Sequence, residues 1–475
     1  MSEVMFKRIL LAVLLVLGVS LPSTYAQCST NFVNGTDYFP SKVTFDGDSD
    51  FQVTYYNSYK IVNNTLANET YVLYCTAYSP TNIGVPSNAK YIQVPVVKSI
   101  AVTDISAIGF LKAIGMEKNV TYATNPENVT APCLQQSISN FTGASNQIGV
   151  VFTNTPAADG SYVTLSLSDD MSPLQKADRV KLVSLFFDKE DEANTYYNAT
   201  QTAYSCHAQN AKISLQDKNK KSIAWVAYDG SAYNIIADSY HMNLTQDAGA
   251  LPLTTKATSY TNLNDFQTAV FNVDFLIDLT YFDPNQLTWS NWLKLFGYVE
   301  NDDDNTPDFI NKKRVYRIGG LQNPSGHEDW FENAEAMPDI VLKDLISIQY
   351  PLYVKSYRPT WLLDFAAAEP PTIVNATDCV SGQSPDTCTI GAFNVEDDGG
   401  DDGDNNGDDG NDSNGSHGLA IGLGVAGGLL ALASISAGAF ILRKKYKEKF
   451  FELKEEPSVQ LTEVNGEIRL TQIKQ

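Results

Sequence analysis

The chain has 475 residues, and its 33 basic and 55 acidic side chains give a formal net charge of −22 at pH 7. A charge of this sign argues against nucleic acid as a partner, because proteins that bind nucleic acid present basic surfaces to phosphate. The chain is too long for one hydrophobic core, so we expect more than one folded lobe.

The first 26 residues have the pattern of a secretory signal. Lys7 and Arg8 precede an apolar run from Ile9 to Leu21, and a cleavage site that ends in Ala26 follows. We therefore predict a signal peptide over residues 1–26 and a mature protein that enters the secretory pathway.

Short apolar strand patterns, each followed by a polar loop, recur between residues 27 and 393. The expected strands are Tyr71–Tyr74, Ser99–Val102, Ile148–Phe152, Ser222–Ala227 and Ala269–Ile277, with a helix at Ala107–Ile114. Strands that alternate with helices predict an α/β fold with largely parallel sheets, here two Rossmann-like lobes over residues 27–171 and 212–393. In such sheets ligands bind where the carboxyl ends of the strands meet.

Residues 172–211, between the two lobes, are predicted to form one long linking helix. Ser172 is a favourable N-cap, Pro173 suits the first helical position, and no Gly or Pro occurs from Leu174 to Cys206. A continuous helix here would join the lobes rigidly and limit their movement. Two helices with a break near Asn194 are the alternative.

The covalent chemistry indicated by the sequence is that of a secreted chain. All six cysteines follow the predicted signal peptide and precede the apolar segment near the C-terminus, which suits disulfides in an oxidising compartment. Proximity predicts a Cys379–Cys388 disulfide and leaves the other pairings open. Sequons are dense in the same region, so we expect N-linked glycans on Asn34, Asn63, Asn68, Asn119, Asn128, Asn140, Asn198, Asn243 and Asn375, with further sequons at Asn411 and Asn414.

The C-terminal part changes composition twice. Residues 394–418 hold nine acidic and no basic side chains, which predicts a disordered stalk. Leu419–Leu442 is an uncharged stretch of 24 residues, long enough for a transmembrane helix, and Arg443 opens a basic cluster. By the positive-inside rule residues 443–475 form a cytoplasmic tail, so we expect a single-pass type I protein of the plasma membrane with an extracellular ectodomain. A buried globular helix is the alternative for the apolar stretch.

Several stretches resemble a known family. SPLQKADRVKLVSLFFDKE (172–190) resembles the start of the linking helix of class III periplasmic binding proteins, which carry iron–siderophores, haem, cobalamin or metal ions. IAVTDISAIGFLKAIGM (100–116) resembles a strand–helix unit of this family. NKKRVYRIGG (311–320) and HEDWFENAEAMPDIVLKDLISIQYP (327–351) resemble its second lobe. A membrane-anchored, glycosylated form is similar to the surface proteins that bind ferrioxamine in mucoralean fungi.

This resemblance implies a binding protein rather than an enzyme. It implies capture of a ferric siderophore, of the ferrioxamine or hydroxamate type, between the two lobes for iron uptake. No cofactor is expected, and the implied partners are the membrane and an iron reductase or permease. An adhesion or sensing receptor on the same fold, and a protein that binds metal ions directly, are the alternatives.

The candidate ligand contacts are aromatic and polar side chains that could face the cleft between the lobes. Aromatic rings there can stack on a bulky chelate, hydroxyl groups can donate hydrogen bonds, and the planar fork of an arginine suits an anionic ligand atom. The candidates are Tyr78, Ser79, Ser106, Tyr228, Tyr233, Tyr240, Tyr281, Arg314, Arg317 and Trp330. For the direct-metal alternative the candidate ligands are His241 and His327, each of which has carboxylates nearby in the sequence.

Overall fold

The computed structural model describes residues 28, 33, 35–45, 49–75, 79–165, 170–281, 287–299, 306–380 and 382–395, and two strands within residues 459–472. The predicted signal peptide, nearly all of the predicted stalk and the apolar stretch Leu419–Leu442 lie outside these residues. Among the described helices, none combines the length and the apolar character needed to cross a membrane. The described part up to Val395 belongs to one compact unit. The separate C-terminal strands β19 (Val459–Val464) and β20 (Glu467–Gln472) pair antiparallel.

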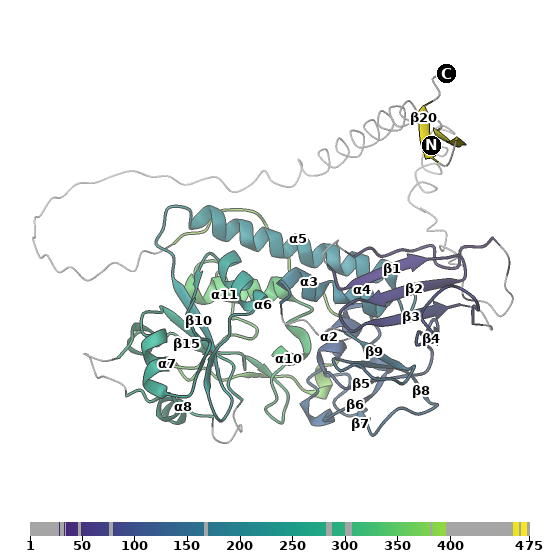
Figure 1. Ribbon diagram of the computed structural model, residues 1–475. Helices are drawn as coiled ribbons and strands as arrows, with labels where there is room; N and C mark the ends of the chain where they lie inside the picture. The colour runs from purple at the N-terminus through teal and green to yellow at the C-terminus, as the bar shows by residue number, and fades with distance from the viewer. Residues whose placement is uncertain are drawn as a thin grey trace, which may run out of the picture. The chain divides into compact units, whose positions relative to one another are not determined.

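The first lobe contains two sheets (Figure 1). One is four-stranded, in the order β1 (Phe51–Tyr55), β2 (Tyr59–Asn64), β3 (Glu69–Tyr74) and β4 (Lys90–Gln93). The other is five-stranded and parallel, in the order β7 (Ser139–Asn140), β6 (Val120–Ala123), β5 (Ser99–Val102), β8 (Ile148–Thr153) and β9 (Tyr162–Thr164). Helix α2 (Ser106–Ala113) follows β5 directly. The predicted strands at Ser99–Val102 and Ile148–Phe152 and the helix after the first of them are confirmed.

The second lobe is built on a seven-stranded mixed sheet. Its order is β13 (Ser259–Tyr260), β11 (Tyr233–Ile235), β10 (Ser222–Tyr228), β14 (Phe275–Asp278), β15 (Val315–Arg317) and β17 (Leu363–Asp364), with β12 (Leu251–Pro252) beside β10. Along β10, Ile223 and Trp225 face one core while Ala224 and Val226 face another, so both sides of the sheet are covered. The covering helices are α6 (Ser239–Asp247) and α11 (Pro338–Gln349) on one side, and α7 (Leu263–Val270), α8 (Trp289–Phe296) and α9 (Asp308–Asn311) on the other. The predicted α/β fold is confirmed, but the prediction of largely parallel sheets is wrong for this sheet and for the four-stranded sheet, which both contain antiparallel pairs.

The predicted strand Ala269–Ile277 is wrong in its first half. Residues up to Val270 belong to α7, and β14 begins only at Phe275. Asn262 caps this helix by accepting hydrogen bonds from the backbone of Asn264 and Asp265. Phe266 and Val270, one helical turn apart, both point into the core, and this packing decides for helix over strand.

The single linking helix over residues 172–211 is also wrong. Three helices occupy this stretch: α3 (Pro173–Ala177), α4 (Arg179–Ser184) and α5 (Glu190–Ser214). The predicted start is confirmed, because Ser172 and Gln175 form a capping box. The chain leaves the helical path after α4, and Asp188 adopts a left-handed backbone conformation with φ of 54°. The break lies before Asn194, which is inside α5.

Three consecutive apolar side chains lie at the break. Leu185, Phe186 and Phe187 follow α4 in a turn, and all three are buried in the first-lobe core. Helix α5 still joins the lobes and runs over both of them (Figure 1). Its first half contributes Tyr196 and Tyr197 to the first core, and its second half contributes Tyr204 and Ala211 to the second.

The predicted Cys379–Cys388 disulfide is wrong. The disulfides are Cys28–Cys75, Cys133–Cys379 and Cys206–Cys388. The segment that carries Cys379 and Cys388 runs between two anchors. At one end β18 (Thr372–Ile373) pairs with β16 (Leu321–Gln322), and at the other end Asn210 in α5 donates a hydrogen bond to Thr389 O (3.0 Å). Cys388 therefore meets Cys206 on α5, whereas Cys379 meets Cys133 of the first lobe, near which Gln135 donates a hydrogen bond to Val374 O (2.9 Å).

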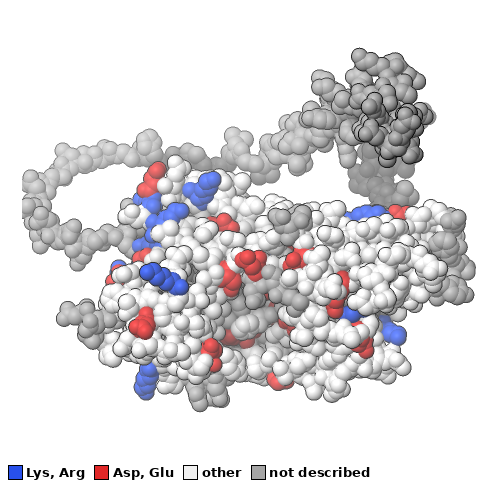
Figure 2. Space-filling view, in the orientation of Figure 1, with Lys and Arg blue, Asp and Glu red and all other residues white. Residues whose placement is uncertain are grey.

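Charge is unevenly distributed over the folded unit. Figure 2 shows Asp and Glu side chains along the middle of one face, while Lys and Arg side chains gather near the end of α5. A few charges are instead fully buried. Lys60 is 0% exposed, and its ammonium contacts Glu190 (2.5 Å) and Asp188 (3.2 Å) at the start of α5. This ion pair fastens the break before α5 to strand β2 of the first lobe.

We predict that Lys60→Ala lowers the free energy of unfolding by about 3–5 kcal/mol, because it leaves the buried Glu190 carboxylate without its partner. Lys189→Ala is the matched control, since it removes an exposed ion pair to Glu192 from the same segment and should cost about 0.2–1 kcal/mol. Denaturant unfolding of the two variants measures both values. Equal costs would contradict a structural role for the buried pair.

Candidate functional site

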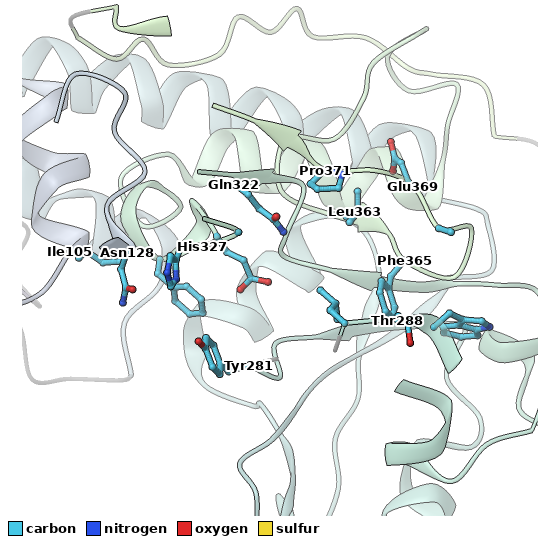
Figure 3. Close-up of a pocket in the computed structure, with 16 residues that line it drawn as sticks. Ile105, Asn128, Tyr281, Thr288, Gln322, His327, Leu363, Phe365, Glu369 and Pro371 are labelled. Atoms are coloured by element: carbon cyan, nitrogen blue, oxygen red, sulfur yellow. The ribbon is translucent and has the colours of Figure 1, made fainter. Parts of the chain in front are cut away.

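A cavity of about 550 Å³ lies where the two lobes meet. The first lobe contributes Ile105 and Asn128 to its wall. The second lobe contributes the remaining lining residues, among them Tyr281, Leu287, Thr288, Trp289, Gln322, His327, Glu328, Phe331, Leu363, Phe365 and Glu369. Figure 3 shows Ile105 and Asn128 on one side, Phe365 and Glu369 on the other, and His327 and Tyr281 between them.

The position of the cavity follows from the sheet topology. Ile105 follows the carboxyl end of β5, and Asn128 follows that of β6. In the second lobe Tyr281 lies three residues beyond the end of β14. The loops after parallel strands of both lobes therefore converge here, as the α/β pattern of the sequence predicts.

Aromatic side chains form much of the lining. Trp289 stacks on Trp292, with ring centroids 5.2 Å apart, and meets Phe365 edge-on at 6.0 Å. Tyr281 is 76% exposed and Phe331 is 47% exposed. These exposed rings offer apolar contact area for a ligand body.

A buried ion pair supports the cavity wall from behind. Asp278, the last residue of β14, lies beside Arg317, the last residue of β15, and both are at most 1% exposed. The Asp278 carboxylate accepts hydrogen bonds from the Arg317 guanidinium and from Trp292 Nε1 (3.0 Å). Arg317 Nη2 also donates to Thr280 O (2.7 Å). The guanidinium is thus committed to the protein rather than to an anionic ligand atom.

Two glutamates carry the negative charge of the lining. Glu369 forms an ion pair with Arg358 (2.7 Å) and accepts a hydrogen bond from the backbone of Asp364 (3.1 Å). Glu328 Oε1 lies 3.5 Å from Arg317 Nη2, the outer limit of a hydrogen bond. Burial raises the pKa of Glu328, against the opposing effect of Arg317.

Direct contacts between the lobes close one side of the cavity. Thr130 donates its backbone N–H to Glu332 (2.8 Å) and its hydroxyl to Asp329 (2.7 Å). These two acids flank the start of helix α10 (Trp330–Asn333), which packs against α2. A Cβ on Gly109 of α2 would lie 2.5 Å from Glu332 O, so only glycine permits this approach. The Cys133–Cys379 disulfide adds a covalent tie near the same junction.

The structure brings only part of the predicted site to this cavity. Tyr281 and His327 line it, Arg317 lies behind its wall, and Ser106 is the buried neighbour of Ile105. Ser79 is exposed but does not line the cavity, and Tyr78 lies outside the described residues.

The remaining predicted contacts are packed elsewhere. Tyr228 and Tyr233 pack on the α7–α8 side of the second-lobe sheet, and Tyr240 and Trp330 belong to the core on its other side. Arg314 lies at the amino end of β15, opposite the cavity edge, over the ring of Phe275 at 5.0 Å.

Of the two candidate metal-binding residues, His327 lines the cavity and His241 lies in the protein interior. His241 is buried among aromatic rings, and its Nδ1 is paired with Asp238 (2.8 Å). Within the described ranges no group of three His, Cys, Asp or Glu side chains has a metal-binding arrangement.

Sequence reasoning missed Trp289, Glu328, Phe331 and Phe365. Trp330 and Phe331 are neighbours in α10, and the sequence alone does not tell which ring faces the core. The structure buries Trp330 and turns Phe331 to the cavity. In the sequence Glu328 is only one of the carboxylates beside His327, because nothing there connects it with Arg317.

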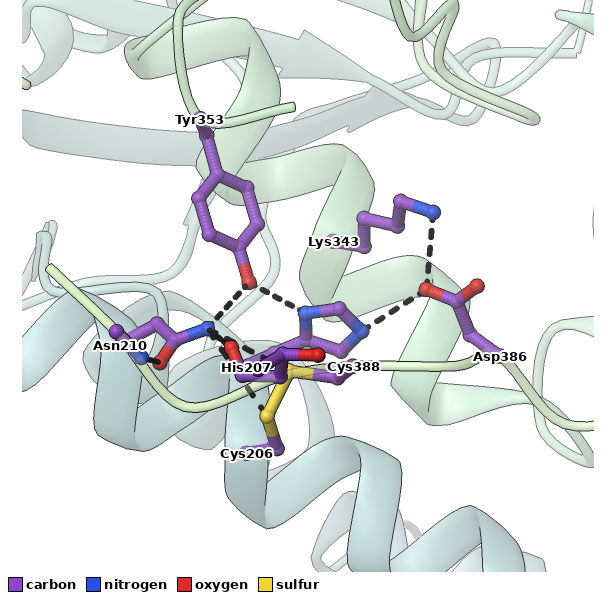
Figure 4. Close-up of a disulfide and its surroundings, with 9 residues drawn as sticks. Cys206, His207, Asn210, Lys343, Tyr353, Asp386 and Cys388 are labelled. Atoms are coloured by element: carbon purple, nitrogen blue, oxygen red, sulfur yellow. Dashed lines mark hydrogen bonds and ion pairs between the residues drawn. A yellow bond between two sulfur atoms is a disulfide. The ribbon is translucent and has the colours of Figure 1, made fainter. Parts of the chain in front are cut away.

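A second polar cluster surrounds the Cys206–Cys388 disulfide (Figure 4). His207 contacts the Tyr353 hydroxyl through Nδ1 (2.5 Å) and Asp386 through Nε2 (3.0 Å). Lys343 pairs with the same carboxylate at 2.9 Å. These partners hold the C-terminal segment against α5 and α11, so the cluster has a structural role.

No protein family model matches the chain, and no curated protein sequence matches it. Similar solved structures include a possible iron-binding periplasmic solute-binding protein from Staphylococcus epidermidis, at 11% identity over 53% of this chain and 98% of that chain, with a TM-score of 0.40. A petrobactin-binding protein from Bacillus subtilis is 12% identical over 53% of this chain and 91% of its own, with a TM-score of 0.37. A periplasmic heme-binding protein from Pseudomonas aeruginosa is 11% identical over 58% and 99%, with a TM-score of 0.42. A likeness this weak does not indicate what the chain does, so a function for it must rest on its own residues.

The sequons differ in their accessibility. Asn68, Asn119, Asn140, Asn198 and Asn375 are exposed, whereas Asn63, Asn128 and Asn243 are half-buried. Asn128 belongs to the cavity wall, and Thr130 of the same sequon is fully buried in the lobe junction.

We predict that the form of this protein that binds ligand carries no glycan on Asn128, because an attached sugar would occupy the cavity. Glycopeptide mass spectrometry of the purified protein checks this, with the exposed Asn198 as the positive control. A glycan on Asn128 in protein that still binds ligand would contradict the assignment of the cavity as the binding site.

The lobe junction should respond to pH through Glu332. Burial raises the pKa of Glu332 to about 7 from an ordinary value of 4.5, and Asp329 adds to the effect. The stability due to protonated Glu332 is present below about pH 4.5 and is lost as the pH rises to about 7. We predict that Glu332→Gln removes this loss, so the variant gains stability relative to wild type across that range. Denaturant unfolding at a series of pH values measures the difference, and parallel curves would contradict it.

Proposed function

We propose that this protein is a cell-surface substrate-binding protein that captures a ferric siderophore of the hydroxamate type for iron uptake. The observation that carries the proposal is the aromatic-lined cavity at the carboxyl ends of strands from two α/β lobes. Its volume of about 550 Å³ lies within the range of roughly 300–1,000 Å³ that is typical of small-molecule sites.

The chemistry of the lining supports a chelate rather than a bare ion. A trihydroxamate surrounds its iron with its own oxygen atoms, so the protein meets mainly organic surface. Trp289, Phe331 and Phe365 provide apolar area for such a surface, and Gln322 and Asn128 provide amide groups beside it.

The junction between the lobes supports capture without a wide hinge motion. The Thr130 contacts to Asp329 and Glu332, the Cys133–Cys379 disulfide and α5 all connect the two lobes. A preformed cavity binds with less loss of conformational entropy than one that must be assembled.

The setting of this activity is part of the proposal. The signal peptide, the acidic stalk and the apolar stretch Leu419–Leu442 would place the two lobes outside the plasma membrane. The bound complex would then pass to an iron reductase or a permease in the same membrane.

Titration of the purified full-length chain with a ferric trihydroxamate, followed by tryptophan fluorescence, tests the proposal. We expect saturable quenching with a dissociation constant of about 1 μM or lower, because Trp289 lines the cavity. Trp289→Phe should remove most of the quenching, while Trp225→Phe, a change in the second-lobe core where Nε1 donates to Thr245, serves as the control.

Two outcomes would overturn the proposal. One is the absence of saturable binding to any ferric siderophore. The other is tight binding of bare zinc or manganese ions that is lost in His327→Ala, which would favour the direct-metal alternative.

A further inference from the structure

We propose that the cavity selects ligands that carry a positively charged ammonium group, and that Glu328 receives this group. The inference rests on the proposed function. It adds the sign of the charge on the ligand and the residue that contacts this charge. It is drawn from the charges that remain in the lining once the ion pairs of the protein are formed.

The lining contains acidic but no basic side chains among the described residues. Its two carboxylates are Glu328 and Glu369, and neither lysine nor arginine belongs to it. Two guanidiniums lie beside the lining: that of Arg317 is 1% exposed and engaged by Asp278 and by Thr280 O, and that of Arg358 is paired with Glu369. Because both guanidiniums are already paired with carboxylates, an anionic ligand would meet negative charge without a cation of its own.

Glu328 differs from Glu369 in how well its charge is balanced. Glu369 has the close ion pair with Arg358 at 2.7 Å. Glu328 shares Arg317 with Asp278, which is closer to the guanidinium, and its own contact is 3.5 Å long. The charges of Asp278 and Arg317 balance each other. The negative charge of Glu328 therefore has no close counter-charge of its own, in a wall that is largely shielded from water.

A carboxylate without a close ion pair and with little contact with water is stabilised by a cation on the ligand. The Glu328 side chain is 13% exposed, so its own hydration is incomplete. An ammonium group of the ligand would restore the missing counter-charge and form a charge-assisted hydrogen bond. The faces of Tyr281, Trp289 and Phe365 in the same lining also favour cations over anions.

The same reasoning predicts which ligands bind poorly. A ferric complex with a carboxylate or a negatively charged chelate centre would bring like charges together in this wall. A complex of the same size with a neutral end would bind through its apolar body alone. The order of affinity is therefore cationic, neutral and anionic.

Three ferric trihydroxamates that differ only at one end test this order. The first has a terminal amine, the second its N-acetyl derivative and the third its N-succinyl derivative, so the end group is cationic, neutral or anionic. With the full-length chain at pH 7 we expect the amine form to bind about tenfold more tightly than the acetylated form, and the succinylated form to bind most weakly.

Matched variants connect the preference with one residue. Glu328→Gln should weaken binding of the amine form about tenfold and change binding of the acetylated form by less than about threefold. Glu369→Gln removes a charge from the same cavity, and its effect on the amine form should be clearly smaller because Arg358 already balances that carboxylate. Thermal unfolding of each variant shows that it is folded.

The outcomes separate this inference from the proposed function. Equal affinities for the three complexes would overturn the charge preference while the siderophore-binding function stands. Equal losses in the two glutamine variants would show a general acidic field and overturn the role of Glu328. Failure of all three complexes to bind would overturn the proposed function and the inference with it.

Discussion

The close approach of α2 and α10 is the constraint on which the rest of the site depends. Gly109 allows the backbone of Glu332 to come near, and Thr130 binds Asp329, which precedes α10, and Glu332 within it. Ile105 directly precedes α2, while His327, Glu328 and Phe331 lie immediately before or within α10. The contact that joins the lobes therefore also positions both walls of the cavity.

Three further ties act on the same arrangement. Helix α5 contributes side chains to both cores, the Cys133–Cys379 disulfide links the lobes covalently, and the Lys60 ion pair fastens the start of α5 to the first lobe. Because these ties are spread over the interface, wide opening of the lobes would break several of them together. A ligand would thus meet a cavity whose shape is already set, and selection would depend on its lining.

Local charge balance, and not the net charge of −22, governs that lining. Arg317 is the kind of residue that sequence reasoning assigns to an anionic ligand, yet its charge is consumed by Asp278 on the neighbouring strand. Glu328 is therefore the group whose negative charge a cationic ligand would balance. The sign of the preferred ligand charge follows from this pairing, which no count of charged residues reveals.

The sequence by itself determined the features that depend on neighbouring residues. The Ser172 capping box, the strands β5 and β8 and the helix α2 follow from capping and periodicity, which act within a few residues. Tertiary structure alone decided the break after α4, the disulfide partners and the choice between Trp330 and Phe331 for the cavity. Each of these depends on contacts between segments far apart in the chain: the first-lobe core that buries Leu185 to Phe187, the two anchors of the C-terminal segment, and the packing of α10 on α2. Burial at such contacts is worth more free energy than local propensity, so it overrides the local pattern where the two disagree.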